Sequence, residues 1–348
     1  MSALAETGAL QRDLSAIVGE QNVAQESPAI NGIVPAYAVT PASAEEIAAL
    51  LSFANRRGLV VAPAGNFTKQ DIGGIPDRID ILLRTQRLSG IQKYDPGDLT
   101  ISINAGTPFS EIQSALAEHQ QWLPYDAPNL EHSTVGGCMA TGAAGPLKHA
   151  FGGLRDFCIG VHFATADGRL GKGGGMVVKN VAGYDLMKLM TGSYGSLAVI
   201  TRANFKVFPR PRQTRTFVCC FGSLDEALKF REKIFASPLQ PICLEVLSPR
   251  TTEYLSDAPV PEDPDHYAPS HPVALASKVW QIVLRAGGSE NILTRYKREL
   301  GAAVSAELEG AAEDRFWDWI SKFEYSVLGR HQNAMVIYTH SPITDIGP

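Results

Sequence analysis

The chain has 348 residues, a formal net charge of −5 at pH 7 and 45% hydrophobic residues. This length allows two domains with well-buried cores, and the scattered lysines and arginines exclude the basic patch of a nucleic-acid-binding protein. Apolar runs are too short for a membrane span, and the N-terminus lacks the pattern of a signal peptide. We therefore expect a cytoplasmic protein, with docking to a membrane-associated partner left open.

The first elements follow a strand and helix pattern. We expect residues 1–29 to form an N-terminal helical segment and the next domain to begin at residue 30. Ser43 and Glu46 form a capping box before a helix with one apolar face. Further along, 79–85 is expected to be a strand, 93–107 a hairpin around the Pro96–Gly97 turn, and 107–120 an amphipathic helix.

A glycine-rich turn follows a predicted strand at 59–62, which we expect to end at Pro63. Backbone N–H groups in such a turn can converge on an anion, and Thr68 adds a hydroxyl. Asn66 tolerates a left-handed conformation. The predicted ligand contacts in this turn are Pro63, Ala64, Gly65, Asn66, Phe67 and Thr68.

A second segment of small residues and hydroxyls spans 127–146. Its non-periodic pattern favours a loop pressed on a diphosphate or a ribityl chain, although an ordinary loop remains an alternative. The predicted contacts here are Pro128, Ser133, Thr134, Val135, Gly136, Gly137, Ala140, Thr141, Gly142 and Gly145.

The third glycine-rich segment is 171–208, in which three adjacent glycines precede a strand-like run at 176–186. A second glycine pair then leads into a β-rich run that stops at Pro209. Glycines on both sides of apolar segments predict a wall of bare peptide against a large flat ligand, with hairpin turns as the alternative for any single pair. The predicted contacts are Gly183, Tyr184 and Ile200; for Tyr184 a core position is the other interpretation.

Competing motifs are absent from the sequence. There is no G-x-G-x-x-G that opens a helix after a first strand, and Gly171–Lys172 is followed by glycine where a P-loop needs serine or threonine. Five cysteines include no C-x-x-C pair, so zinc and iron–sulfur ligation are disfavoured and buried thiols are expected. Nicotinamide, ATP and a bound metal are therefore not expected.

Beyond Pro211 the pattern changes to a second domain, 213–348, with an antiparallel sheet and helices on one face. The predicted strands are 214–222, 242–249, 279–289 and 333–340, and the predicted helices are 223–237, 290–306 and 313–328; a proline-rich exposed loop is expected at 256–272. The whole chain is thus of the α+β class.

Residues 30–212 resemble the FAD-binding domain of the vanillyl-alcohol oxidase family, the p-cresol methylhydroxylase type of flavin fold. The motifs at 63–68, 133–142 and 171–200 carry this resemblance. It implies a two-subdomain FAD-binding fold. Members that bind flavin covalently use histidine, cysteine or tyrosine at particular places. The first loop offers none of these, so we expect non-covalent FAD. Where the family usually has Arg-Gly-Gly-Gly, this chain reads Ala64-Gly65-Asn66-Phe67, which removes a positive charge.

The segment 171–208 is most similar to the FAD-containing subunits of glycolate oxidase, the smaller one in particular. The resemblance implies two partners: a larger FAD-containing subunit that oxidises a 2-hydroxy acid, and an iron–sulfur subunit that accepts the electrons. A hydroxy-acid dehydrogenase needs a base for the hydroxyl proton and a cation or metal for the carboxylate. The histidines after residue 212 have no metal-ligand spacing, and Arg330 and His331 are the best candidate catalytic pair that remains.

We therefore expect an FAD-binding subunit of a glycolate-oxidase-type complex, in which FAD serves electron transfer or assembly. One alternative is a self-sufficient FAD-dependent 2-hydroxy-acid dehydrogenase. The other is a scaffold subunit whose flavin site has decayed.

Overall fold

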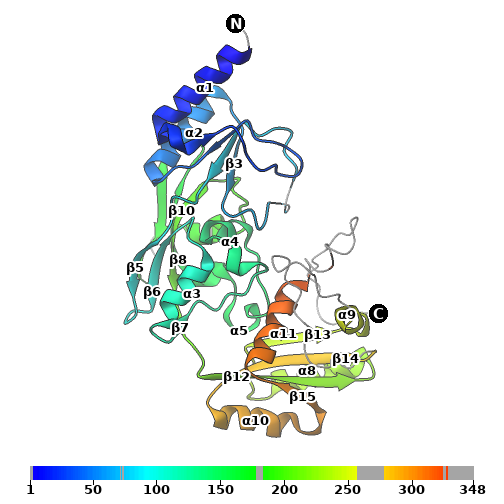
Figure 1. Ribbon diagram of the computed structural model, residues 1–348. Helices are drawn as coiled ribbons and strands as arrows, with labels where there is room; N and C mark the ends of the chain where they lie inside the picture. The colour runs from blue at the N-terminus through cyan, green and yellow to red at the C-terminus, as the bar shows by residue number, and fades with distance from the viewer. Residues whose placement is uncertain are drawn as a thin grey trace. The chain divides into compact units, whose positions relative to one another are not determined.

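The computed structural model describes residues 3–70, 72, 74–177, 183–256, 278–323 and 327. The chain divides into two compact units. The first runs to Gln213 and the second begins at Thr214, except that 287–290 group with the first. Figure 1 shows the elements of both units in chain order.

The first unit opens with a four-stranded mixed sheet. Its strand order is β1 (Val23–Ala24), β2 (Tyr37–Val39), β4 (Ile81–Arg84) and β3 (Val61–Ala64). Strands β2 and β3 both run parallel to β4, and β3 lies at the sheet edge. Because an edge strand tolerates a missing N–H, β3 continues through Pro63 instead of ending there as predicted.

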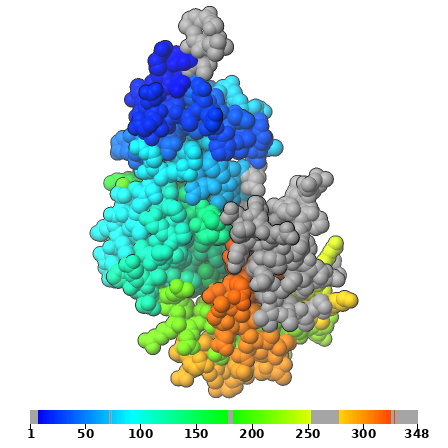
Figure 2. Space-filling view, viewed as in Figure 1, coloured from blue at the N-terminus to red at the C-terminus, as the bar shows by residue number. Residues whose placement is uncertain are grey.

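Helix α2 (Ala44–Arg57) confirms the capping-box prediction. The Glu46 N–H donates to Ser43 Oγ at 3.1 Å, and the Glu46 carboxylate accepts from the Ala42 N–H at 2.7 Å. Its predicted apolar face is buried and shares a core with Leu14 and Val18 of helix α1 (Ala3–Val18). In the space-filling view, these N-terminal residues form the blue region of the first unit (Figure 2).

A five-stranded antiparallel sheet forms the other half of the first unit. Its order is β5 (Ile91–Asp95), β6 (Thr100–Asn104), β10 (Val199–Lys206), β8 (Cys158–Ala164) and β9 (Leu170–Gly174). The predicted hairpin is β5–β6. Helix α3 (Phe109–Ala117) is the predicted amphipathic helix, and Phe109, Ile112 and Leu116 are buried. Shorter elements are β7 (Gln121–Trp122), α4 (Val135–Thr141), α5 (Lys148–Phe151), α6 (Leu154–Phe157), α7 (Leu186–Met190) and β11 (Phe208–Pro209).

The predicted strand at 176–186 is wrong for the residues that the structure describes. Met176 and Val177 lie outside any strand, and helix α7 begins at Leu186. The preceding glycines serve packing inside the sheet. A Cβ on Gly174, whose φ is +66°, would lie 2.2 Å from the Ile159 carbonyl oxygen. Gly174 ends the edge strand β9, and none of Gly173, Gly174 and Gly175 lines the pocket described below.

The second unit contains a four-stranded sheet. The order is β13 (Cys243–Leu247), β14 (Trp280–Gly288), β12 (Gln213–Phe221) and β15 (Val304–Leu308). Its helices are α8 (Leu224–Ala236), α9 (Pro249–Ser256), α10 (Glu290–Leu300) and α11 (Ala311–Ser321). The predicted strand 333–340 and nearly all of the predicted loop 256–272 lie outside the described residues.

Two features of this unit differ from the predictions. The helix predicted for 290–306 ends at Leu300, because Gly301 takes a left-handed φ of +58°, a common helix ending; the following residues form β15 instead. Helices also cover both sheet faces. Phe217 and Cys219 pack in one core with α8 and α10, whereas Thr216, on the opposite face of β12, accepts a hydrogen bond from Trp317 of α11.

Candidate functional site

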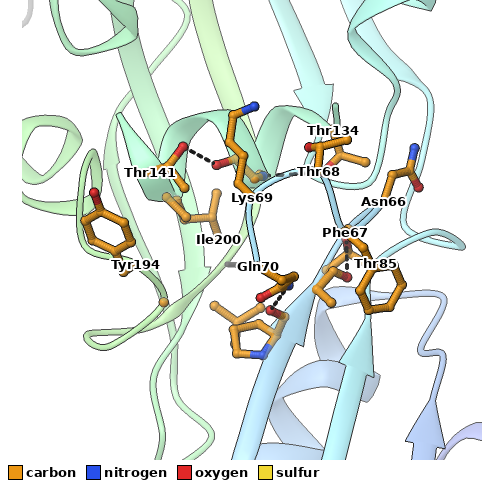
Figure 3. A pocket seen from close by; sticks show the side chains of 18 of the residues that line it. Asn66, Phe67, Thr68, Lys69, Gln70, Thr85, Thr134, Thr141, Tyr194 and Ile200 are labelled. Carbon is orange, nitrogen blue, oxygen red and sulfur yellow. Dashed lines mark hydrogen bonds between the residues drawn. The ribbon is translucent and has the colours of Figure 1, made fainter. Parts of the chain in front are cut away.

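A pocket in the first unit is lined by three segments that lie far apart in the sequence (Figure 3). They are the loop after β3, helix α4 and the segment that leads into β10. Its volume of about 120 Å³ is below the several hundred Å³ that enclose a drug-sized ligand. A ligand as long as a dinucleotide therefore has to extend beyond it.

Most predicted contacts lie on this wall. They are Pro63, Ala64, Gly65, Asn66, Phe67, Thr68, Thr134, Gly136, Gly137, Ala140, Thr141 and Ile200. The wall also contains residues that were not predicted, namely Lys69, Gln70, Ile72, Thr85, Tyr194, Gly195, Ala198 and Val199. Pro128, Ser133, Val135, Gly142, Gly145, Gly183 and Tyr184 were predicted and do not line it.

The loop after β3 has the properties of an anion-binding turn. Among the described residues, no acceptor takes a hydrogen bond from the backbone N–H of Asn66 or Phe67. The left-handed residue is Phe67, with φ of +61°, and not Asn66 as predicted. The Asn66 amide instead donates to the His132 carbonyl oxygen at 3.0 Å. This side chain ties the loop to the segment before α4.

Lys69 is the main residue that the sequence analysis missed. Its side chain is only 8% exposed, and its Nζ donates to the Pro128 carbonyl oxygen at 2.8 Å and to Ser133 Oγ at 3.1 Å. Ser133 Oγ also lies 2.9 Å from Thr68 Oγ1. Pro128 and Ser133 therefore support the pocket wall from behind. Residue type gave no signal for this position, because lysines are rarely buried.

The predicted loop at 133–142 is largely the helix α4. Thr134 caps it, and the N–H groups of Val135, Gly136 and Cys138 donate to Thr107, Ala105 and Thr134 carbonyl oxygens. These groups are not available to a ligand, contrary to the expectation of a loop with free N–H groups.

The two glycines of α4 differ in their surroundings. A Cβ on Gly136 would lie 2.9 Å from the Cβ of Ala105, so this glycine permits close packing. A Cβ on Gly137 would meet only Thr134 Oγ1, at 3.3 Å. Gly137 is thus the position at which the helix leaves space in the pocket.

Protein packing explains several predicted residues that lie outside the pocket. Gly142 ends α4 with φ of +63°, and a Cβ on Gly145 would lie 2.4 Å from the Asp126 carbonyl oxygen. Val135 is fully buried in the core. Tyr184 is 91% exposed, so it is not a core aromatic.

The third wall comes from residues 194–200. Tyr194 has φ of +52°, and its N–H donates to the Ala140 carbonyl oxygen at 2.8 Å, which joins this segment to α4. Gly195 allows close approach to the first loop, since an added Cβ would lie 2.8 Å from Pro63 Cγ. Pairs of glycines before β10 were the available signal, but they did not identify Tyr194.

Two residues near helix α4, Cys138 and His132, are poorly placed to bind flavin covalently. Cys138 is fully buried, and burial raises the pKa of its thiol; a thiol that stays protonated is a weak nucleophile. The His132 side chain is 74% exposed and does not line the pocket.

The candidate catalytic residues Arg330 and His331 lie outside the described residues. Within the part of the chain that the structure describes, no three His, Cys, Asp or Glu side chains gather as metal ligands. In the same part, no helix combines the length and apolar character needed to cross a membrane.

Comparison with known proteins identifies the domain around the pocket. Residues 35–186 match the family model of an FAD binding domain. A stretch of 124 residues is 48% identical to glycolate oxidase subunit GlcE of Escherichia coli and makes up 35% of each chain. A stretch of 215 residues is 31% identical to D-lactate dehydrogenase of Archaeoglobus fulgidus, covering 62% of this chain and 48% of that protein.

A solved structure of p-cresol methylhydroxylase with substrate bound has a TM-score of 0.64 at 15% identity, covering 93% of this chain and 72% of that one. At this identity the likeness shows the fold alone. The matched stretch spans about half of the length of the D-lactate dehydrogenase and about a third of the length of GlcE. Residues 35–186 match the FAD binding domain family model, and the predicted p-cresol methylhydroxylase-type fold and FAD cofactor are confirmed.

Proposed function

We propose that this chain is an FAD-binding subunit of a glycolate-oxidase-type complex and holds its FAD non-covalently in the pocket. The observation that carries the proposal is the meeting of three distant segments on one pocket wall inside an FAD-binding domain. Bound FAD would supply a redox centre whose properties the surrounding protein tunes.

The pocket residues suit the parts of FAD differently. The loop after β3 offers the backbone N–H groups of Asn66 and Phe67, which are donors for the diphosphate. Gly137 leaves open space beside it. Ile200, Ala198 and Val199 form an apolar wall that shields a ligand from water.

The pocket wall contains no His, Asp, Glu or Arg among the described residues. Oxidation of a hydroxy acid needs a base and a cation for the carboxylate. The Lys69 ammonium is buried and donates to Pro128 and Ser133, and no His, Asp or Glu accompanies it on the described wall. We infer that the larger FAD-containing subunit oxidises the 2-hydroxy acid, and that an iron–sulfur subunit accepts the electrons.

One comparison supports the role of a subunit. GlcE is named as a glycolate oxidase subunit, and because the match covers the same share of both chains, the two have about the same length. The D-lactate dehydrogenase relative favours the second candidate, a self-sufficient 2-hydroxy-acid dehydrogenase. A scaffold with a decayed flavin site is the third.

The test is purification of the chain from its native host under mild conditions. The proposal expects a yellow complex with the larger flavin subunit and an iron–sulfur subunit, and an iron signal. It also expects one FAD on each copy of this chain, in addition to that of the larger subunit, and acid precipitation should release this FAD completely. A colourless chain would favour the scaffold. Flavin that stays with the acid precipitate would contradict non-covalent binding.

A further inference from the structure

The five-stranded sheet of the first unit has one apolar face and one polar face. Ile101 and Ile103 of β6 are buried in a core with residues of helices α3 and α4. Successive residues of a strand point to opposite sides of the sheet, so Ser102 and Asn104 lie on the other side, which we call the polar face. The strand register identifies the residues of the neighbouring strands that share this face.

Three neighbouring strands carry a row of basic side chains on the polar face. Arg202 of β10 pairs with Asn104 on one side and with His162 of β8 on the other. Lys172 of β9 pairs in turn with His162. Residues directly opposite each other on antiparallel strands have Cβ atoms about 4.5–5.5 Å apart. Arg202, His162 and Lys172 are therefore successive neighbours across the sheet.

The remaining charges of the polar face are also mostly positive. Lys93 of β5 pairs with Ser102, and Lys206 of β10 lies four residues after Arg202 and on the same face. Within the five strands, all of which the structure describes, Asp95 is the single Asp or Glu. The polar face is thus basic, although the whole chain has a net charge of −5.

Neither Arg202 nor Lys172 has a carboxylate partner among the described residues. Arg202 Nε donates to the neutral Asn104 Oδ1 at 3.4 Å, and Lys172 is exposed. Burial lowers the pKa of His162, and the charges of Arg202 and Lys172 lower it further. His162 is therefore held in its neutral form, and the positive charges on either side of it are not balanced by the protein.

We propose that the polar face is a docking surface for an acidic surface of a partner subunit. Unbalanced positive charge attracts an acidic partner over some distance and accelerates the association of the two proteins. Arg202, Lys172 and Lys93 are the cations that carboxylates of the partner would meet. This inference rests on the proposed function, because it takes the partner to be a subunit of the glycolate-oxidase-type complex.

An acidic protein surface fits the polar face better than another polyanion does. The net charge of −5 on the whole chain repels a nucleic acid or an anionic membrane, whereas a protein can present a few carboxylates locally. Ser102, Asn104 and Asn204, which lie between the basic positions, are neutral and buried. The positive charges are therefore separated from one another, which suits individual carboxylates.

The experiment measures how fast this chain associates with the purified larger flavin subunit and with the iron–sulfur subunit, by surface plasmon resonance at several salt concentrations. The double variant Lys93→Glu/Lys172→Glu reverses two exposed charges of the polar face. The matched control Arg12→Glu/Lys148→Glu reverses two exposed charges on helices α1 and α5 of the same unit. None of these four residues lines the pocket, so the flavin content of each variant shows whether the first unit is folded.

We expect the polar-face variant to associate about 10-fold more slowly than the wild type at low salt, with a much smaller change in the dissociation rate. At high salt, where exposed charges are screened, the two association rates should converge. The control variant should stay within about twofold of the wild type at every salt concentration.

Equal slowing by both variants, no slowing by either, or slowing that persists at high salt would overturn the inference. Salt-sensitive binding of a single-stranded oligonucleotide or of phosphatidylglycerol vesicles, lost in the polar-face variant, would assign this face to a different polyanion and would also overturn it. If the wild type associates with neither subunit, the proposed function fails. If the wild type associates and the two variants behave alike, only the docking surface is wrong.

Discussion

At the scale of single residues, the glycines around the pocket fall into two groups. Gly65 and Gly195 permit close contact between the walls, and Gly136 permits close packing on Ala105, because an added Cβ at each would lie within 3 Å of another protein atom. Gly137 has no such neighbour. Its lack of a side chain is therefore important for what enters the pocket and not for how the walls pack.

Substitution of Gly137 tests this difference. We expect Gly137→Val to place a side chain where the ligand lies and to release FAD on gel filtration, with the melting temperature of the flavin-free protein nearly unchanged. Gly175→Val is the control, since an added Cβ at Gly175 meets nothing within 4 Å and the residue does not line the pocket. Retention of one FAD per chain by Gly137→Val would contradict the assignment.

The cysteines permit a second test at this scale. Four of the five are buried, and only Cys220 is partly exposed. Burial raises the pKa of Cys158 and of Cys219 from 9.0 to about 12, and it also raises that of Cys138. Because the thiolate is the reactive form, we expect a thiol reagent at pH 8 to label Cys220 alone in the native protein. A Cys220→Ser variant should then not react, and labelling of native Cys138 would contradict its assigned environment.

The same pKa shifts predict a change in stability with pH. Cys158 and Cys219 stay protonated in the native state while the unfolded thiols ionise. Their contribution to stability is complete below about pH 9 and is lost progressively as the pH rises towards 12. The free energy of unfolding, measured in urea, should fall over this range, and Cys158→Ala should reduce the slope.

At the scale of the elements, caps and periodicity predicted much of the fold. Ser43 and Glu46 identified α2, and the Pro96–Gly97 turn identified β5–β6. Helix α4 was mistaken for a loop because Gly136 and Gly137 are poor helix formers. Thr134 and Gly142, however, are the cap residues that could have revealed it. Strand β15 was not predicted, because the helical periodicity of residues 290–306 does not indicate that α10 ends before Gly301.

A buried carboxylate, that of Glu313, helps attach helix α11 to its sheet. Glu313 is 1% exposed; it accepts hydrogen bonds from Thr214 and Thr216 and forms an ion pair with Arg285 at 3.2 Å. We expect Glu313→Gln to lower the free energy of unfolding of the second unit by about 2–4 kcal/mol, because removing one partner leaves the other charge buried. The control Asp314→Asn, at a 70% exposed carboxylate that also contacts Arg285, should cost less than about 1 kcal/mol. Equal costs in urea melts would contradict this role of Glu313.

At the scale of the whole molecule, the family and cofactor could be predicted from the order and spacing of three glycine-rich segments. The composition of the pocket could not. Tyr194 and Lys69 line the pocket. Tyr194 has a left-handed backbone and Lys69 has a buried side chain, and neither property follows from residue type. The glycines at 171–175 were expected to contact a ligand, but none of them lines the pocket.

The composition of the pocket predicts what the isolated chain does to a substrate. Hydride leaves a hydroxy acid readily only when a base takes the hydroxyl proton and a cation fixes the carboxylate. The acid–base part alone contributes about 10²–10⁴-fold. Since the described pocket wall offers no His, Asp or Glu, we expect slow background turnover of glycolate and D-lactate even with FAD bound.

Anaerobic mixing of the yellow protein with millimolar glycolate or D-lactate measures this directly, by the bleaching of the flavin absorption band. We expect slow bleaching by the isolated chain and rapid bleaching once the larger flavin subunit is added, because that subunit would supply the base. Arg330 and His331 are the residues most able to reverse the result, since an arginine beside a histidine base would form a workable site. Rapid bleaching of the isolated chain that is lost in His331→Ala would identify a self-sufficient dehydrogenase and replace the proposed subunit role.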